Sequence, residues 1–400
     1  MPATPTPPSH TSETSDWPTQ LRAAMRVQGV YLDHAACSPL PHATAAAMHG
    51  YIDDFTQQGS GDWPRWRRQV EVARKHAAAL VGLPHAAVAM VRNTTEGITL
   101  IAEGLPWQPG DNVVVPADEF PSNLFPWQNL ESRGVEVRIV PSPSKSHTIR
   151  LDPQPLAAAC DDRTRVVACS WVGYKLGDRA DLAALRAIAD AHGQALGGTR
   201  LFIDAIQGLG MHPLDMAGQG IDFLAADGHK WLLGPEGAGI LAIAPGRLHE
   251  LRPLGVGWNS AREAAAFDSS QMNLRDDAAR YEGGTYPAVT MVGLAASLDV
   301  LAEVSPIERE AHLMTLTDHL REQLRRRGGI VHSPDDAVHR TAITAVEFPD
   351  RDPVAIRQRG LDQPPSHRIV TSVRGGLLRL APHAYQTPAD LDAALDRLGL

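Results

Sequence analysis

The chain has 400 residues, of which 43% are hydrophobic, and it carries a formal net charge of −9. This length can bury a large core and predicts two or three domains. The charge is spread along the chain, with no basic block and no arginine run interleaved with aromatic residues, which argues against a nucleic-acid partner.

No apolar run approaches the ~20 residues that a membrane-spanning helix needs, so no membrane partner is predicted. The three cysteines, Cys37, Cys160 and Cys169, show no metal-ligand spacing, and no metal site is predicted. An odd, sparse set of cysteines is typical of the reducing cytoplasm, which is the expected location.

Residues 1–16 are rich in Pro, Ser and Thr and lack the apolar core of a secretory signal, so we expect a disordered lead-in. From about residue 87 to residue 244, short apolar runs alternate with amphipathic helical patterns. This alternation predicts an α/β fold with a mostly parallel sheet and helices on both faces. The seven predicted strands are Val88–Val91, Asn112–Val115, Val135–Val140, Arg165–Ser170, Leu201–Asp204, Phe223–Ala226 and Gly239–Ala244.

The C-terminal part predicts a smaller α+β domain, and the weakly periodic segment from about residue 255 to 284 predicts a loop region at a domain or subunit boundary. We expect a large domain over 17–275, with its N-terminal segment packing on the small domain, and a small domain over 276–400. The helices and strands predicted in the second part are 291–304, 307–326, 342–348, 369–372 and 388–398.

A lysine beside a histidine follows the sixth predicted strand. Lys230 is one of only four lysines, and Trp231 follows it. In an apolar setting its amine would lose proton affinity, and a neutral amine can form a Schiff base with a carbonyl. On its own, the pair is also typical of a surface lysine after a buried strand. Asp204 ends the neighbouring predicted strand, where it is either a helix N-cap or a carboxylate that meets Lys230 at the same edge of the sheet.

The stretch Asn93–Gly97 follows the first predicted strand and opens a helix. Free backbone N–H groups at a helix start, with the hydroxyls of Thr94 and Thr95, make an anion site, although a plain threonine N-cap has the same pattern. Together with an aldehyde-binding lysine and an aspartate that pairs with a pyridinium nitrogen, a phosphate cradle completes the site of pyridoxal 5′-phosphate.

With these motifs in family order, the chain resembles the class V aminotransferase family of fold-type I pyridoxal phosphate enzymes. That family includes cysteine desulfurases, selenocysteine lyases and isopenicillin N epimerase-like proteins. The resemblance spans nearly the whole chain, and the segments that carry it are 31–36, 93–97, 119–123, 204–207, 228–230, 281–285 and 379–387.

The resemblance implies how the cofactor is held. Lys230 would bind its aldehyde as a Schiff base and then move the Cα proton of the substrate. Asp204 would pair with the pyridinium nitrogen, and Gln207 would touch the ring on its hydroxyl side. The residues implied to hold the phosphate are Thr94, Thr95 and His229.

The resemblance also implies a partner and a substrate class. Thr285 matches a position that reaches the phosphate of the neighbouring subunit, so a homodimer with composite sites is implied. Arg379 matches an arginine that grips the substrate α-carboxylate in a bidentate fork, which implies amino-acid substrates. Arg374 is a rival for the same role, and a strand-edge surface arginine is the alternative for Arg379.

Departures from the family pattern bear on the reaction. Phe120 stands where many members stack a proton-transferring histidine on the cofactor, and Tyr174 stands where an asparagine often touches the ring oxygen. Asp227 replaces a phosphate-site serine, and we expect it to turn away or to bind the backbone. No cysteine follows Cys169, which argues against a desulfurase with a thiol relay.

The leading hypothesis is therefore a pyridoxal phosphate enzyme that removes the Cα proton of an amino acid and eliminates a β-substituent, which we expect to be sulfur, without a cysteine relay. An aminotransferase or an amino-acid epimerase is the alternative. A non-catalytic cofactor-binding protein is a remote third, because Lys230, Asp204 and Arg379 are all present.

Overall fold

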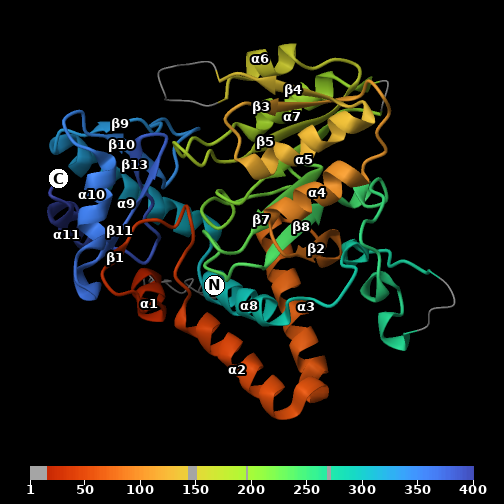
Figure 1. The fold of residues 1–400 in the computed structure, drawn as a ribbon, viewed down its shortest axis with the longest axis horizontal. Coiled ribbons are helices and arrows are strands. Elements are labelled where there is room, and N and C mark those ends of the chain that lie inside the picture. Colours follow the sequence, from red (N-terminus) through yellow and green to blue (C-terminus); the bar gives the residue numbers. More distant parts are fainter. Residues whose placement is uncertain (1–15, 143–150, 195–196, 268–271) are drawn as a thin grey trace, which may run out of the picture.

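A seven-stranded sheet forms the centre of the structure, a computed structural model that describes residues 16–142, 151–194, 197–267 and 272–400 (Figure 1). The strand order is β2-β8-β7-β6-β5-β3-β4. β8 runs antiparallel to both of its neighbours, and the other pairs are parallel. The mostly parallel sheet is thereby confirmed. The predicted lead-in lies outside the described residues except for Asp16.

All seven predicted strands are present, with bounds that differ from the predicted ones by at most one residue at either end. They are β2 (Val88–Val91), β3 (Asn112–Pro116), β4 (Glu136–Val140), β5 (Thr164–Ser170), β6 (Arg200–Asp204), β7 (Phe223–Asp227) and β8 (Gly239–Ile243). Every residue of β6, β7 and β8 is buried, as expected for strands covered on both faces.

Two apolar clusters cover the two faces, because successive side chains of a strand point to opposite sides. On β6, Leu201 and Ile203 belong to one cluster and Phe202 to the other. α7 packs on the first face, together with parts of α3 and α8, and α4 and α5 pack on the second. The helices up to this point are α1 (Trp17–Ala24), α2 (His42–Gln58), α3 (Trp63–Val81), α4 (Thr94–Gly104), α5 (Phe125–Gln128), α6 (Pro153–Ala158), α7 (Leu182–Ala191) and α8 (Ala288–Ala302).

A four-stranded antiparallel sheet, with the order β12-β13-β10-β9, forms the C-terminal part. Its core includes residues from α9, α10 and α11. These elements are α9 (Pro306–Arg326), β9 (Ile330–Val331), β10 (Thr344–Glu347), α10 (Pro353–Leu361), β11 (Ile369–Val370), β12 (Ser372–Arg374), β13 (Leu377–Leu380) and α11 (Pro388–Leu398).

The N-terminal segment lies against this C-terminal part (Figure 1). β1 (Val30–Tyr31) pairs in parallel with β11, and Arg22 of α1 donates to Asp390 of α11 at 3.0 Å. The first strand of the chain and one of its last strands therefore form one small sheet. The division predicted at residues 275 and 276 stays a prediction.

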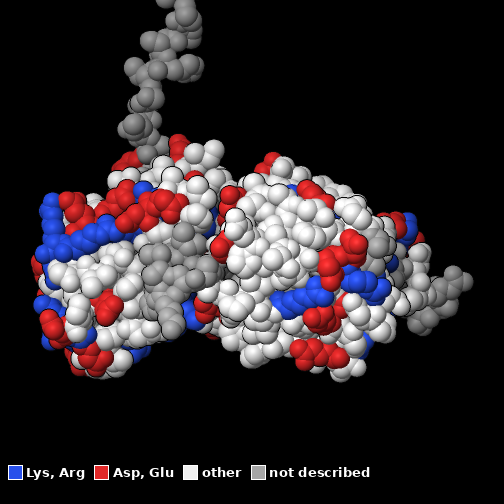
Figure 2. Space-filling model, turned by 90° about the horizontal axis from the view of Figure 1, so that it is seen from above, with Lys and Arg blue, Asp and Glu red and all other residues white. Residues whose placement is uncertain are grey.

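The segment predicted as a loop region, from about residue 255 to 284, contains only short 3-10 turns in its described part. Acidic and basic side chains are intermixed on the face in Figure 2. Within the described ranges no single helix is long and apolar enough to cross a bilayer, although α8 and α9 pass the same test as a pair bent by 81°.

Candidate active site

A cavity of about 410 Å³ opens beyond the carboxyl ends of the central strands. β6 and β7 are parallel neighbours, with Asp204 opposite Ala225, and Lys230 follows β7 by three residues. Asp204 and Lys230 therefore lie at the same edge of the sheet, as the sequence predicts. The residues that line the cavity are Ala35, Ala36, Asn93, Thr94, Thr95, Phe120, Ser122, Tyr174, Asp204, Ile206, Gln207, Asp227, His229, Lys230, Arg374 and Arg379.

Lys230 is buried, and burial is the main reason why the pKa of its amine falls to about 8. Asp204 opposes this shift, whereas the positive charge of Arg379 adds to it. The Ser38 hydroxyl donates to the Lys230 carbonyl at 2.6 Å and so fixes the backbone beneath the amine. A substantial neutral fraction of Lys230 near pH 8 is what a carbonyl-binding amine requires.

Asp204 is 2% exposed and faces the cavity from the end of β6. Its Oδ1 accepts from the Ile206 N–H at 3.0 Å, so the carboxylate is oriented by its own loop. Gln207, one turn on, lines the same cavity, but its amide is already engaged: Nε2 donates to Ala35 O at 2.8 Å, and Oε1 accepts from the Trp231 indole at 3.0 Å.

The start of α4 forms a cradle beside Lys230. Asn93 caps the helix by accepting from the Glu96 N–H at 2.9 Å, so the N-cap is Asn93 and not a threonine. The buried Thr94 hydroxyl lines the cavity and has no hydrogen-bond partner in the described part of the chain, so it is available to a ligand. Thr95 donates to the Ser122 hydroxyl at 2.8 Å. A helix N-terminus with an unpartnered hydroxyl fits a phosphate.

Asp227 differs from what the sequence predicts. We expect it to turn away or to bind the backbone, but its buried Oδ1 lies 3.0 Å from His229 Nδ1 and lines the cavity. The two atoms are close but lack the alignment of a hydrogen bond.

Arg379 reaches the cavity from β13 and is 1% exposed. Its guanidinium donates to Asp33 Oδ1 at 2.9 Å, to Ser372 Oγ at 3.1 Å and to the Tyr174 carbonyl at 2.7 Å. Three of its five N–H groups are thus fixed by three separate segments of the chain, and two remain. It is therefore a buried, oriented cation and not a strand-edge surface arginine.

Arg374 is half-buried at the mouth of the cavity and donates to the Val373 carbonyl at 2.9 Å. Two aromatic side chains form the opposite wall. Phe120 meets Tyr174 edge to face with ring centres 5.3 Å apart, and the Lys230 amine lies 5.8 Å from the Phe120 ring centre. Phe120 is 45% exposed, so its ring is available to stack on a planar ligand.

Thr285 is absent from the lining of this cavity, and it is exposed in the loop that precedes α8. Sequence reasoning missed the roles of Asp33, Ser372 and Ser122 around the cavity. Asp33 and Ser122 lie within segments that carry the family resemblance, but no local pattern shows that they contact Arg379 or Thr95. No sequence pattern around Ser372 indicates that it lies near the cavity.

The chain is similar to known proteins of one family. The pattern of the aminotransferase class-V family matches residues 30–359. A probable cysteine desulfurase of Methanothermobacter thermautotrophicus is 32% identical over 295 residues, which cover 73% of this chain and 71% of that protein. A cysteine desulfurase of Klebsiella pneumoniae is 30% identical over 329 residues, which cover 78% and 76%.

Two solved structures share the fold. The cystine C–S lyase C-DES, in complex with its product cysteine persulfide, has a TM-score of 0.82 at 21% identity, covering 92% of this chain and 96% of that one. The cysteine desulfurase CsdA of Escherichia coli has a TM-score of 0.81 at 24% identity, covering 96% and 97%. The chain belongs to the class V aminotransferase family.

Within that family the chain is a cysteine desulfurase-like enzyme of fold type I, and the family is pyridoxal phosphate-dependent. The predicted fold class and enzyme class are confirmed.

Proposed function

We propose that this chain binds pyridoxal 5′-phosphate and catalyses β-elimination at the Cα of a sulfur-containing amino acid, as a C–S lyase without a cysteine relay. The observation that carries the proposal is the convergence of three groups on one cavity: the desolvated amine of Lys230, the buried carboxylate of Asp204 and the orphaned hydroxyl of Thr94.

These residues fit the cofactor group by group. Lys230 would hold the aldehyde, Asp204 the pyridinium nitrogen, and the start of α4 the phosphate, with Thr94, Thr95 and His229 around it. Phe120 would stack on the ring, and Gln207 and Tyr174 would border it. When bound, the cofactor supplies an electron sink for the charge left at Cα after the proton departs.

Arg379 would bind the α-carboxylate. Two of its N–H groups remain after those given to Asp33, Ser372 and Tyr174, which matches the two oxygens of one carboxylate. Lys230 would take the Cα proton, because its lowered pKa gives it a neutral fraction near physiological pH. Phe120 cannot transfer protons, so acid–base work falls on Lys230.

The cysteines support a reaction without a thiol relay. A relay needs a thiolate nucleophile. Burial raises the pKa of Cys37, with Glu236 and Asp227 adding to the shift, and burial raises that of Cys160 to about 11. None of the three cysteines lines the cavity. Sulfur would therefore leave as the thiol of the substrate and not as a protein persulfide.

The test is a product assay with S-methyl-L-cysteine. A lyase adds water overall and releases methanethiol, pyruvate and ammonia in equal amounts. Cys37→Ala should retain this activity, because no protein thiol takes part. A pyridoxamine form of the cofactor would instead identify an aminotransferase, and racemised substrate would identify an epimerase. Loss of sulfur release in Cys37→Ala, with the cofactor still bound, would overturn the relay-free reaction.

We further propose a homodimer in which Thr285 completes the phosphate site of the partner subunit. Its exposure in the loop before α8, outside the cavity of its own chain, supports this arrangement. Thr285→Ala should weaken cofactor retention in the dimer, measured by dialysis and absorbance, and Thr56→Ala on exposed α2 is the control. A monomer that retains cofactor equally well contradicts the composite site.

A further inference from the structure

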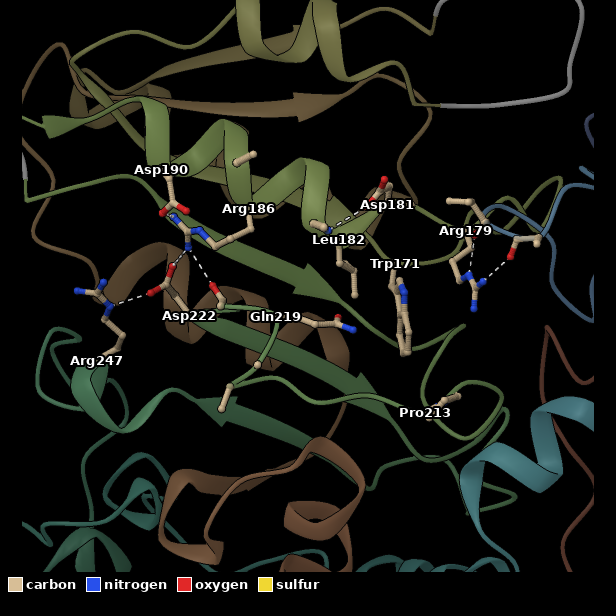
Figure 3. A pocket seen from close by; sticks show the side chains of 18 residues that line it. Trp171, Arg179, Asp181, Leu182, Arg186, Asp190, Pro213, Gln219, Asp222 and Arg247 are labelled. Carbon is tan, nitrogen blue, oxygen red and sulfur yellow. Dashed lines mark hydrogen bonds and ion pairs between the residues drawn. The ribbon is translucent and has the colours of Figure 1, made fainter.

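A groove of about 1000 Å³ lies between α7, the 213–220 loop and residues 337 and 338 (Figure 3). Three arginines and three aspartates line it. Each arginine is paired with a carboxylate of the chain itself. One of them, Arg179, points away from α7 toward the C-terminal part of the chain.

Arg179 joins two distant segments. Its guanidinium donates to the carbonyls of Val338 and Ala337, each at 2.8 Å, and to Glu310 of α9 at 3.0 Å. Its backbone N–H donates to the His339 carbonyl at 2.8 Å. These four acceptors belong to the C-terminal part, whereas Arg179 itself follows β5 of the large sheet. Its Nη1 also lies 3.2 Å from Nδ1 of His212, in the large part.

Arg179 closes a hairpin of residues 171–180. An antiparallel bridge pairs it with Val172. The tip of the hairpin is also tied to the C-terminal part, because Thr341 Oγ1 donates to the Gly177 carbonyl at 2.6 Å. Gly177 has a φ of +73°, and a Cβ there would lie 2.4 Å from Ile343 Cβ, so the two segments approach as closely as only glycine allows.

The other side of this hairpin faces the active-site cavity. Tyr174 lines the cavity with its ring, and its carbonyl accepts from Arg379 Nη1 at 2.7 Å. A displacement of the hairpin tip would therefore move an acceptor that orients Arg379. Asp204 contacts the base of the hairpin, where the Trp171 N–H donates to its carbonyl at 2.8 Å, and Lys230 lies on another segment.

We propose that Arg179 is a positioning residue for recognition of the substrate α-carboxylate: by holding the 171–180 hairpin against residues 337–339 and Glu310, it fixes the Tyr174 carbonyl and thereby the orientation of Arg379. This inference rests on the proposed function of Arg379. Arg179 touches neither cofactor nor substrate, and its effect is confined to ligands that carry the carboxylate.

The test compares two ligands that differ only in the carboxylate, S-methyl-L-cysteine and 2-(methylthio)ethylamine, titrated by the absorbance change of the holoenzyme. In Arg179→Met the Kd or KM of the amino acid should rise roughly 3–10-fold, while binding of the amine stays unchanged. Arg179→Lys keeps a positive charge near Glu310 but cannot make all three hydrogen bonds of the guanidinium. Its Kd or KM for the amino acid should therefore lie between those of the wild type and Arg179→Met.

Arg186→Met is the matched control. Arg186 lines the same groove and donates to Gly220, Thr199 and Asp222, all in the large-sheet part. Its loss should therefore leave the Kd of both ligands unchanged. The proposal is wrong if Arg179→Met raises the Kd of both ligands by the same factor. It is also wrong if the Kd or KM of the amino acid is the same in Arg179→Met as in Arg186→Met. If the wild-type protein responds to neither ligand, the proposed function fails instead.

Hydrogen exchange on the cofactor-free chain gives a second readout that needs no bound group. In Arg179→Met the peptides that cover residues 171–180 should exchange faster, whereas those that cover β6 and β7 should not. Unchanged exchange in the hairpin would overturn the positioning role even if the variant lost activity.

Discussion

The two halves of the active site are built differently. The half that would hold the cofactor is formed by the ends of β6 and β7 and the start of α4, all in one sheet layer of the large part. The half that would hold the substrate carboxylate depends on Arg379, whose three partners are Asp33 near the N-terminus, Ser372 on β12 and Tyr174 in the 171–180 hairpin.

This difference in construction predicts that the two halves govern different steps, the reaction itself and the recognition of the substrate. The cofactor half is fixed by strands that are buried on both faces, so we expect its geometry to be less sensitive to change in the C-terminal part. The carboxylate half is assembled by contacts between segments up to 346 residues apart, and it moves when any of them moves. Variants in the first half should remove the reaction, and variants in the second should weaken selection of the substrate.

The largest effect is expected for Lys230→Ala. Loss of the amine removes both the cofactor link and the base, so turnover should fall by at least about 10³-fold. Lys75→Ala, which removes an exposed lysine of α3 outside the cavity, should keep full turnover and is the control. Steady-state kinetics on cofactor-saturated protein measure both, and a Lys230→Ala enzyme that keeps a tenth of its turnover would contradict the assignment.

Arg379→Lys should affect the carboxylate half alone. Lysine keeps the charge beside Asp33 but lacks the planar fork, so the KM for S-methyl-L-cysteine should rise about 10–100-fold with a smaller change in kcat. The cofactor absorbance should stay at its wild-type level. A fall in kcat with unchanged KM would move the carboxylate site elsewhere, with Arg374 as the next candidate.

Thr94→Val probes the orphaned hydroxyl of the cradle. Because Thr94 Oγ1 has no partner within the described residues, the cofactor-free chain should lose no stability, and its Tm should match the wild type. The affinity for pyridoxal phosphate should fall by about 3–10-fold, the value of one hydrogen bond. Equal cofactor affinity in the two proteins would show that the hydroxyl does not face the phosphate.

The pH dependence of cofactor uptake tests the pKa of Lys230. The folded-state pKa of about 8 lies below the ordinary lysine value of 10.5, so the neutral amine forms as pH rises through about 8. Uptake by the cofactor-free chain should accelerate about fivefold from pH 7 to pH 8 and level off above pH 9. A rate that keeps rising to pH 10 would show an amine that burial does not perturb.

The sequence predicts that the residues of the cofactor half share one cavity, because its signals are local. Buried apolar runs define β6 and β7, and the side chains that end or follow parallel neighbours must meet, which brings Asp204 to Lys230. The contact between Asp227 and His229 was not predicted, because it depends on the rotation of two side chains within one turn.

The carboxylate half was predicted only as far as Arg379 itself. Its partners Asp33, Ser372 and the Tyr174 carbonyl lie on segments whose proximity is set by the packing of β1 on β11 and of the hairpin on residues 337–339. No pattern within any one segment encodes such a contact. Arg179 gives no local signal for the same reason, since its acceptors are mostly backbone carbonyls.

Reduction of the purified holoenzyme with borohydride, followed by peptide mapping, tests the central claim most directly. The account predicts that the reduced cofactor is attached to the peptide that contains Lys230, and that Lys230→Ala carries no attached cofactor. Attachment at Lys75, Lys145 or Lys175, or a wild-type protein that carries no cofactor at all, would contradict it.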